Sequence, residues 1–183
     1  MKLLFASDLH GDVSAVKALL KAFEKEGADR LVLLGDLLYH GPRNDLPRAY
    51  DPKGVIALLN EKKDIILAVR GNCDTEVDQM VLEFPILADY AVLLLSNGGL
   101  AYLTHGHRYN EQTPPPMTAK DILMHGHTHV AGVTKCRDGQ VCLNPGSVSM
   151  PKGNTPPCYI VLEDNVFRIK CLKDGSEYAL FEA

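Results

Sequence analysis

Short polar segments rich in aspartate and histidine follow several apolar runs of this sequence. The apolar run at residues 31–34 ends in Gly35 and Asp36, where the glycine leaves room for a ligand beside the carboxylate. A carboxylate at the end of a buried strand is costly unless a cation or several hydrogen-bond donors satisfy it. Asp36 is therefore the candidate centre of a metal site.

Four other polar segments also place side chains that can bind a metal directly after an apolar run. With Asp36 they supply Asp8, Asn72 and up to four histidines from among His10, His105, His107, His125, His127 and His129. These oxygen and nitrogen donors suit Mn, Fe, Zn or Mg and not a cysteine-rich structural zinc site. Seven ligands exceed the need of one ion. Two ions about 3.5 to 4 Å apart that share Asp36 would account for them, as in enzymes that catalyse displacement at phosphorus.

The first two of these segments lie in a predicted β-α-β unit. Apolar residues recur at helical spacing over residues 13–26, between predicted strands at residues 2–6 and 30–34. A right-handed crossover makes such strands parallel neighbours. The polar residues that follow both strands then lie at one carboxyl edge of the sheet, where open α/β sheets bind ligands.

The rest of the chain is predicted to be rich in β-strands. A third strand follows at residues 65–69, and the C-terminal half is expected to form antiparallel strands. No linker or repeat divides the 183 residues, a length that suits one sizeable core. We therefore expect one α/β domain over residues 1–183.

The composition argues against two classes of partner. The formal net charge of −4 and the pI near 5.9 give no basic surface for stable binding to nucleic acid or to an anionic membrane. No apolar run approaches the ~20 residues of a membrane span, and the first strand begins at Lys2 without a signal-peptide pattern. A cytoplasmic location is expected.

The five cysteines form no CxxC pair, and their odd number argues for reduced thiols. Cys136 and Cys142 flank Asp138-Gly139, the signal of a two-residue hairpin turn. That register pairs residue 136 with residue 141 and directs the two thiols to opposite faces. Both are interpreted as plain strand residues.

Five motifs, in this order, resemble those of the calcineurin-like metallophosphoesterases. They are Asp8-x-His10, the GDxxxxG pattern from Gly35 to Gly41, Gly71-Asn72-Cys73-Asp74, His105-Gly106, and Gly126-His127-Thr128-His129. The segments HGPRN, THGH and NPGSVSxPKG are most similar to those of small single-domain bacterial phosphodiesterases in this family. The resemblance covers nearly the whole chain.

The resemblance implies an α/β sandwich of two mixed β-sheets flanked by helices, with a dimetal site at the carboxyl edge of the strands. It implies that Asp8, His10 and His129 hold one divalent ion, that Asn72, His105 and His127 hold the other, and that Asp36 bridges both. Mn²⁺ is the preferred ion, with Zn²⁺, Fe²⁺, Ni²⁺ or Mg²⁺ as alternatives. The implied enzyme is a phosphoric diester hydrolase in which a metal-bridging hydroxide attacks a small phosphodiester.

One motif departs from the family pattern. Most members have a histidine where this chain has Cys73, and that histidine is the usual candidate for protonating the leaving oxygen or stabilising the transition state. A thiol with an unperturbed pKa near ~8.5 suits this task less well, so we expect good leaving groups and diesters to be favoured.

The catalytic candidates are Asn72, Cys73, Asp74 and His105, and the substrate-binding candidates are Arg43 and Asn44. For Arg43, a solvated loop arginine is the simpler interpretation.

His107 and His125 are predicted not to be primary ligands. Gly106 marks a turn of the backbone between His105 and His107, whereas only the family pattern excludes His125. Both side chains would orient ligands.

A non-catalytic metal-binding scaffold or regulatory module that keeps this fold is the main rival, as proposed for a retromer subunit of the same fold. Loss of a ligand such as His10 would favour the scaffold, but every ligand position is filled. The sequence therefore favours the enzyme. Edge strands and β-rich termini further predict a homodimer or homotetramer.

Overall fold

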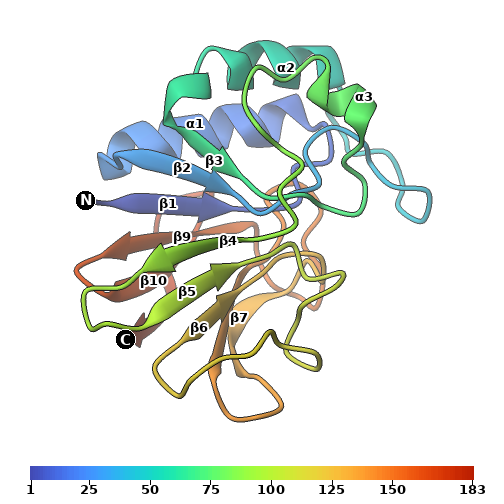
Figure 1. The fold of residues 1–183 in the computed structure, drawn as a ribbon. Coiled ribbons are helices and arrows are strands. Elements are labelled where there is room, and N and C mark those ends of the chain that lie inside the picture. Colours follow the sequence, from blue (N-terminus) through green and yellow to red (C-terminus); the bar gives the residue numbers. More distant parts are fainter.

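The computed structural model describes residues 1–183 and contains two mixed β-sheets and three helices. The helices are α1 (Val13–Glu26), α2 (Pro52–Asn60) and α3 (Glu76–Gln79), with a 3₁₀ turn at Lys63–Ile65. Figure 1 shows α1 and α2 over the outer face of the first sheet, while the second sheet packs on the opposite side. The expected α/β sandwich is confirmed. No helix of this fold combines the length and apolar character that crossing a bilayer requires.

The two sheets are defined by their strand order. The first sheet runs β11 (Glu177–Glu182), β10 (Val166–Cys171), β9 (Cys158–Glu163), β1 (Leu3–Ala6), β2 (Arg30–Leu33) and β3 (Ile66–Ala68). The second sheet runs β4 (Ala91–Leu94), β5 (Leu100–Leu103), β6 (Ile122–Met124), β8 (Val141–Pro145) and β7 (Ala131–Lys135). Strands β1, β2 and β3 are parallel, as the predicted β-α-β unit requires.

Strand β1 is buried on both faces because successive side chains point to opposite sides. Leu4 and Ala6 pack into the core beneath α1, whereas Leu3 and Phe5 pack into the core between the two sheets. Two cores therefore fix the position of this strand. The residues that follow β1 therefore begin from a fixed position in the fold.

The C-terminal half differs from the expected antiparallel arrangement. β5, β6 and β8 pair in parallel, and β9 pairs antiparallel with β1 to extend the first sheet. Parallel neighbours need crossover connections, which alternation of apolar residues within a strand does not reveal. As a result of this parallel pairing, the polar segments after β5 and β6 reach the same edge of the second sheet.

The hairpin between β7 and β8 corrects the prediction for Cys136 and Cys142. Lys135 pairs with Val141 and the Cys136 N–H bonds to the Gln140 carbonyl, so the turn is one residue longer than expected. A shift of one residue moves a side chain to the other face. Both thiols lie on the same face and form a disulfide, with Cα atoms 5.9 Å apart. The expectation of reduced thiols is therefore wrong for this pair, while the other three cysteines are free.

Candidate metal centre

Tight turns place the candidate ligands. Asp8, His10, Asp36, His127 and His129 all adopt left-handed backbone conformations, with φ between 48° and 66°. This conformation costs a non-glycine residue roughly 1–2 kcal/mol, so the surrounding structure must hold the backbone there. A turn after β1, and not an extended backbone, brings Asp8 and His10 together.

A first group of donors meets at the end of β1. The Nε2 atom of His10 lies 3.2 Å from His129 Nε2 and 3.5 Å from Asp8 Oδ1, and the last two atoms are 3.3 Å apart. The Nδ1 atoms of His10 and His129 lie 2.8 and 2.7 Å from backbone carbonyl oxygens. Because a carbonyl can only accept, each Nδ1 carries the proton and each Nε2 of a neutral ring presents a lone pair.

A second group meets beside the first. His105 Nε2 lies 3.1 Å from Asn72 Oδ1 and 3.2 Å from His127 Nδ1. The Nδ1 atom of His105 donates to the Leu34 carbonyl at 2.7 Å, so Nε2 is the atom that presents a lone pair when the ring is neutral, as it would be when bound to a cation. This group combines loops after β3, β5 and β6.

Asp36 lies between the two groups. Its Oδ2 atom is 3.7 Å from His10 Nε2 and 3.3 Å from His105 Nε2. Its Oδ1 atom accepts the backbone N–H of Cys73 at 2.8 Å. One oxygen is thus held by the protein and the other faces both groups.

The donors fit divalent cations better than they fit one another. Asp8 Oδ1 is buried without a hydrogen-bond partner, and imidazole lone pairs face each other. Ligand atoms bound to one ion at 2.0–2.2 Å lie about 2.8 to 3.6 Å apart at octahedral or tetrahedral angles. The separations within each group fall in that range.

The pKa values of His105 and Asp8 also indicate that the site favours a cation. Burial opposes a charge on His105, but its hydrogen bond to Asp36 and the charge of Asp8 outweigh burial and raise the pKa of His105 to about 9. Burial alone would raise the pKa of Asp8, yet the neighbouring histidines hold it well below its usual value. The buried carboxylates therefore favour positive charge where the imidazoles converge.

Comparison with known proteins identifies the family. Residues 1–165 match the family model of the calcineurin-like phosphoesterase superfamily domain. The chain is a calcineurin-like phosphoesterase. Phosphodiesterase YfcE of Escherichia coli (strain K12) is 47% identical over 176 residues, which cover 96% of this chain and 95% of YfcE.

Solved structures show the same relationship. The structure of YfcE, a phosphoesterase from E. coli, superposes with a TM-score of 0.93 at 45% identity and covers 99% of this chain and 98% of that one. Chaetomium thermophilum Vps29 has a TM-score of 0.60 at 16% identity, with 100% of this chain and 97% of Vps29 covered. At that identity the likeness shows the fold alone.

Asp74 holds two loops of this phosphoesterase together. Its Oδ2 atom accepts the N–H groups of Asp36 and Gly71 at 2.8 and 2.7 Å, and its Oδ1 atom accepts the N–H of Leu37 at 2.9 Å. Gly71 has no room for a side chain, because a Cβ there would overlap the Asp36 carboxylate. Asp74 is 1% exposed, so its carboxylate contacts the loop of Asp36 and not the solvent.

The donor groups of the phosphoesterase open into a cavity of about 420 Å³. Arg43, Asn44, Asn72 and Cys73 line it, so the substrate-binding candidates reach the same space as the ligand candidates. Lys152 also lines this cavity and donates to Asn44 Oδ1 at 3.3 Å. Sequence reasoning missed Lys152, although it lies in the segment NPGSVSxPKG that carries the family resemblance.

Serine side chains support the first donor group from behind. The hydroxyl groups of Ser147 and Ser149 donate to the backbone carbonyl of Asp8 at 2.7 and 2.9 Å. These two contacts hold the turn that carries Asp8. Both serines belong to the segment NPGSVSxPKG, which carries part of the family resemblance.

His107 and His125 lie outside the close donor groups. His125 Nε2 is 2.9 Å from Glu111 Oε2, and its Nδ1 is 3.1 Å from the Gly126 carbonyl. The His107 ring is 5.5 Å from the His105 ring, centroid to centroid. Neither side chain belongs to a group of Asp, His and Cys residues whose ligand atoms all lie within 4.8 Å of one another.

Cys73 is closer to the donors than the sequence suggested. A ligand atom from each of Cys73, His10 and Asp36 lies within 4.8 Å of the others. The Cys73 side chain is buried, and this burial, with the charge of Asp36, raises the pKa of the thiol. Cys73 therefore presents a neutral thiol at the edge of the donor cluster.

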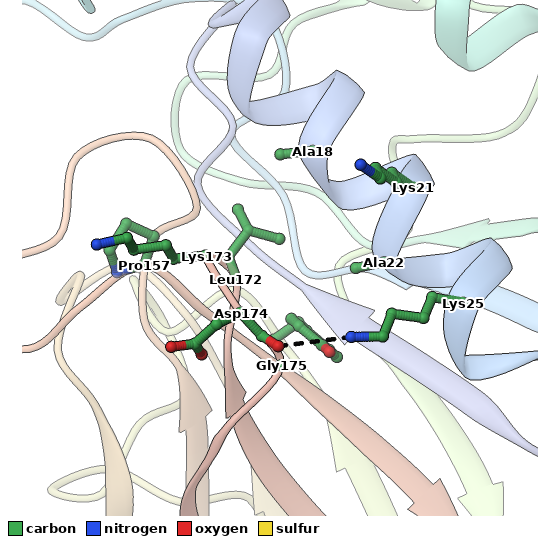
Figure 2. Close-up of a pocket in the computed structure, with 10 residues that line it drawn as sticks. Ala18, Lys21, Ala22, Lys25, Pro157, Leu172, Lys173, Asp174 and Gly175 are labelled. Carbon is green, nitrogen blue, oxygen red and sulfur yellow. Dashed lines mark hydrogen bonds between the residues drawn. The ribbon is translucent and has the colours of Figure 1, made fainter.

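A larger cavity of about 470 Å³ lies elsewhere, between α1 and the turn after β10 (Figure 2). Lys21, Lys25 and Lys173 surround it, and Lys25 donates to the Asp174 carbonyl at 3.5 Å. It contains no histidine, and its one carboxylate is already bonded to Ser176. The convergent donor groups line the smaller cavity and not this one.

Proposed function

We propose that this chain is a metal-dependent phosphodiesterase. The observation that carries the proposal is the position of Asp36 Oδ2 between two convergent groups of carboxylate, amide and imidazole side chains, on the wall of a cavity with cationic side chains. Asp8, His10 and His129 would hold one divalent ion and Asn72, His105 and His127 the other, with Asp36 shared. The similarity to phosphodiesterase YfcE favours diesters as substrates.

The side chains of the site have separable tasks. Bound divalent ions would polarise the phosphoryl oxygens and lower the pKa of a water molecule, which supplies a nucleophile near neutral pH. Arg43 and Lys152 offer charged hydrogen-bond donors to the phosphate. Backbone carbonyls keep the proton of His10, His105 and His129 on Nδ1, so that Nε2 stays available to a ligand.

Further properties belong to the same proposal. Mn²⁺ is the proposed ion, and the oxygen and imidazole donors also suit the alternatives Zn²⁺, Fe²⁺, Ni²⁺ and Mg²⁺. Residues 1–183 would form one domain, since β9, β10 and β11 complete the sheet that β1 begins.

The exposed edge strand β4, with Leu94 80% exposed, supports a homo-oligomer. The three free cysteines support a cytoplasmic location, against which the Cys136–Cys142 disulfide is the contrary observation.

Metal analysis and a diester assay test the proposal together. Protein purified without chelator should carry about two divalent ions per chain and hydrolyse bis(4-nitrophenyl) phosphate. Removal of the ions should abolish turnover, and Mn²⁺ should restore it. Protein that binds two ions but hydrolyses no diester would support the scaffold instead.

Cys73→His is expected to raise the rate on substrates with poor leaving groups. An imidazole beside Asp36 could donate the proton that the neutral thiol gives up poorly. General acid catalysis is worth roughly 10²- to 10⁴-fold in ideal geometry, so an unrefined graft should give about tenfold or less. We would compare kcat/KM across diesters of increasing leaving-group pKa.

Cys73→Ala is the matched control, since it removes the thiol without adding a proton donor. The histidine variant should flatten the dependence on leaving-group pKa, and the alanine variant should not. An identical slope in wild type and Cys73→His would show that position 73 does not deliver the leaving-group proton.

A further inference from the structure

An apolar groove of about 350 Å³ lies beside the catalytic cavity. It runs between α2, α3 and the segment after β2, and its walls include Tyr39, Tyr50, Ile56, Val77 and Val81. Val77 is 69% exposed, and Tyr39 and Val81 are each more than 40% exposed. These apolar side chains remain uncovered next to a polar site.

The groove and the catalytic cavity meet at Cys73, which lines both. A ligand atom of Cys73 lies within 4.8 Å of one on Asp36. A substituent on a phosphate held near Asp36 would therefore need to pass only one small residue to enter the groove. The groove and the place of the proposed reaction thus lie on two sides of Cys73.

The groove offers an occupant mainly apolar contact. Its one carboxylate, on Asp78, already accepts from the N–H and the hydroxyl of Thr75 at 2.7 and 2.8 Å. The catalytic cavity differs, since Arg43, Asn44 and Lys152 give it a polar, cationic wall. The two adjoining spaces thus suit the two chemical parts of a phosphate ester, a charged phosphate and an apolar alcohol.

We propose that this groove binds an aromatic or other apolar ester substituent of the phosphodiester substrate. The inference rests on the proposed function and assigns its substrate class: diesters with at least one apolar substituent. Burial of such a substituent against the valine and tyrosine side chains would favour it over a methyl group. Pocket contacts of this kind are worth about tenfold or more in kcat/KM.

Val77→Asp and Met80→Asp form the test pair. Both residues are exposed at α3 and both changes add one negative charge, but only Val77 lines the groove. Val77→Asp should lower kcat/KM for bis(4-nitrophenyl) phosphate about tenfold, chiefly through KM, while Met80→Asp should leave it within twofold. Val77→Ser, which adds no charge, should give the same direction of change.

Two further measurements separate the alternatives. Methyl 4-nitrophenyl phosphate reports which ester enters the groove: an equal loss with Val77→Asp assigns the leaving group, and no loss assigns the other substituent. Saturation-transfer NMR with phenylphosphonate should show ring contacts in wild type that weaken in Val77→Asp, independently of turnover.

The groove assignment fails if Val77→Asp and Met80→Asp behave alike on the diaryl ester. It also fails if both variants change the mass of the assembly in light scattering, because α3 would then be a subunit contact. Absence of hydrolysis by the wild type would instead refute the proposed function, so the two failures are distinguishable.

Discussion

Asp36→Asn is expected to abolish phosphodiester hydrolysis while the protein remains folded. Oδ1 of Asp36 must stay an acceptor for the Cys73 N–H, so the amide nitrogen of asparagine would take the place of Oδ2. That nitrogen would donate toward the lone pairs of His10 and His105 instead of binding a cation beside them. Because both proposed ions depend on this atom, kcat should fall by at least ~10³-fold.

The measurement combines kcat for bis(4-nitrophenyl) phosphate, bound metal per chain and thermal unfolding. Asp45→Asn is the control, because Asp45 is an exposed carboxylate on the loop that follows the same segment. It should match wild type in all three. Near-wild-type turnover of Asp36→Asn with two ions bound per chain would show that Asp36 does not bridge them.

The β-α-β unit was predictable because its signals are local. The Asp12 carboxylate accepts the N–H groups of Ser14 and Ala15 at the start of α1, and Gly27 ends the helix with φ of 62°. Apolar runs with a fixed handedness of crossover then force β1 and β2 side by side. The ligand candidates followed from the same logic, since each directly follows a strand.

The features that sequence reasoning missed depend on contacts between distant segments. The register of the β7–β8 hairpin depends on one residue in its turn, which dipeptide preferences place only approximately. Lys152 reaches the site because β8 lies beside β6, a parallel pairing that no local pattern encodes. Tertiary packing decides such features.

The position of Asp74 illustrates the same limit at a single residue. The family resemblance made Asp74 a catalytic candidate without fixing its task. The structure instead shows its carboxylate accepting three backbone N–H groups, two of them from Asp36 and Leu37. Asp74, next to Cys73 in the sequence, thus helps to hold the loop that carries Asp36.

Asp74→Asn is therefore expected to lose both stability and activity. Asparagine has a single oxygen, so at least one of the three buried N–H groups would face an NH₂ group instead of an acceptor. Each buried donor left unsatisfied costs roughly 1–3 kcal/mol, so the free energy of unfolding should fall by about 3 kcal/mol. The loop that carries Asp36 should loosen, and kcat should fall by at least ~10²-fold, since positioning errors of about 1 Å have that effect.

Asp121→Asn supplies the matched control for Asp74→Asn. Asp121 is also a buried carboxylate that accepts backbone N–H groups, from Leu100 and Thr118, but it lies away from the catalytic cavity. Denaturant unfolding should show a loss of stability in both variants, whereas kcat per folded molecule should fall only in Asp74→Asn. If Asp74→Asn kept the wild-type kcat while losing stability, Asp74 would support the fold without positioning Asp36.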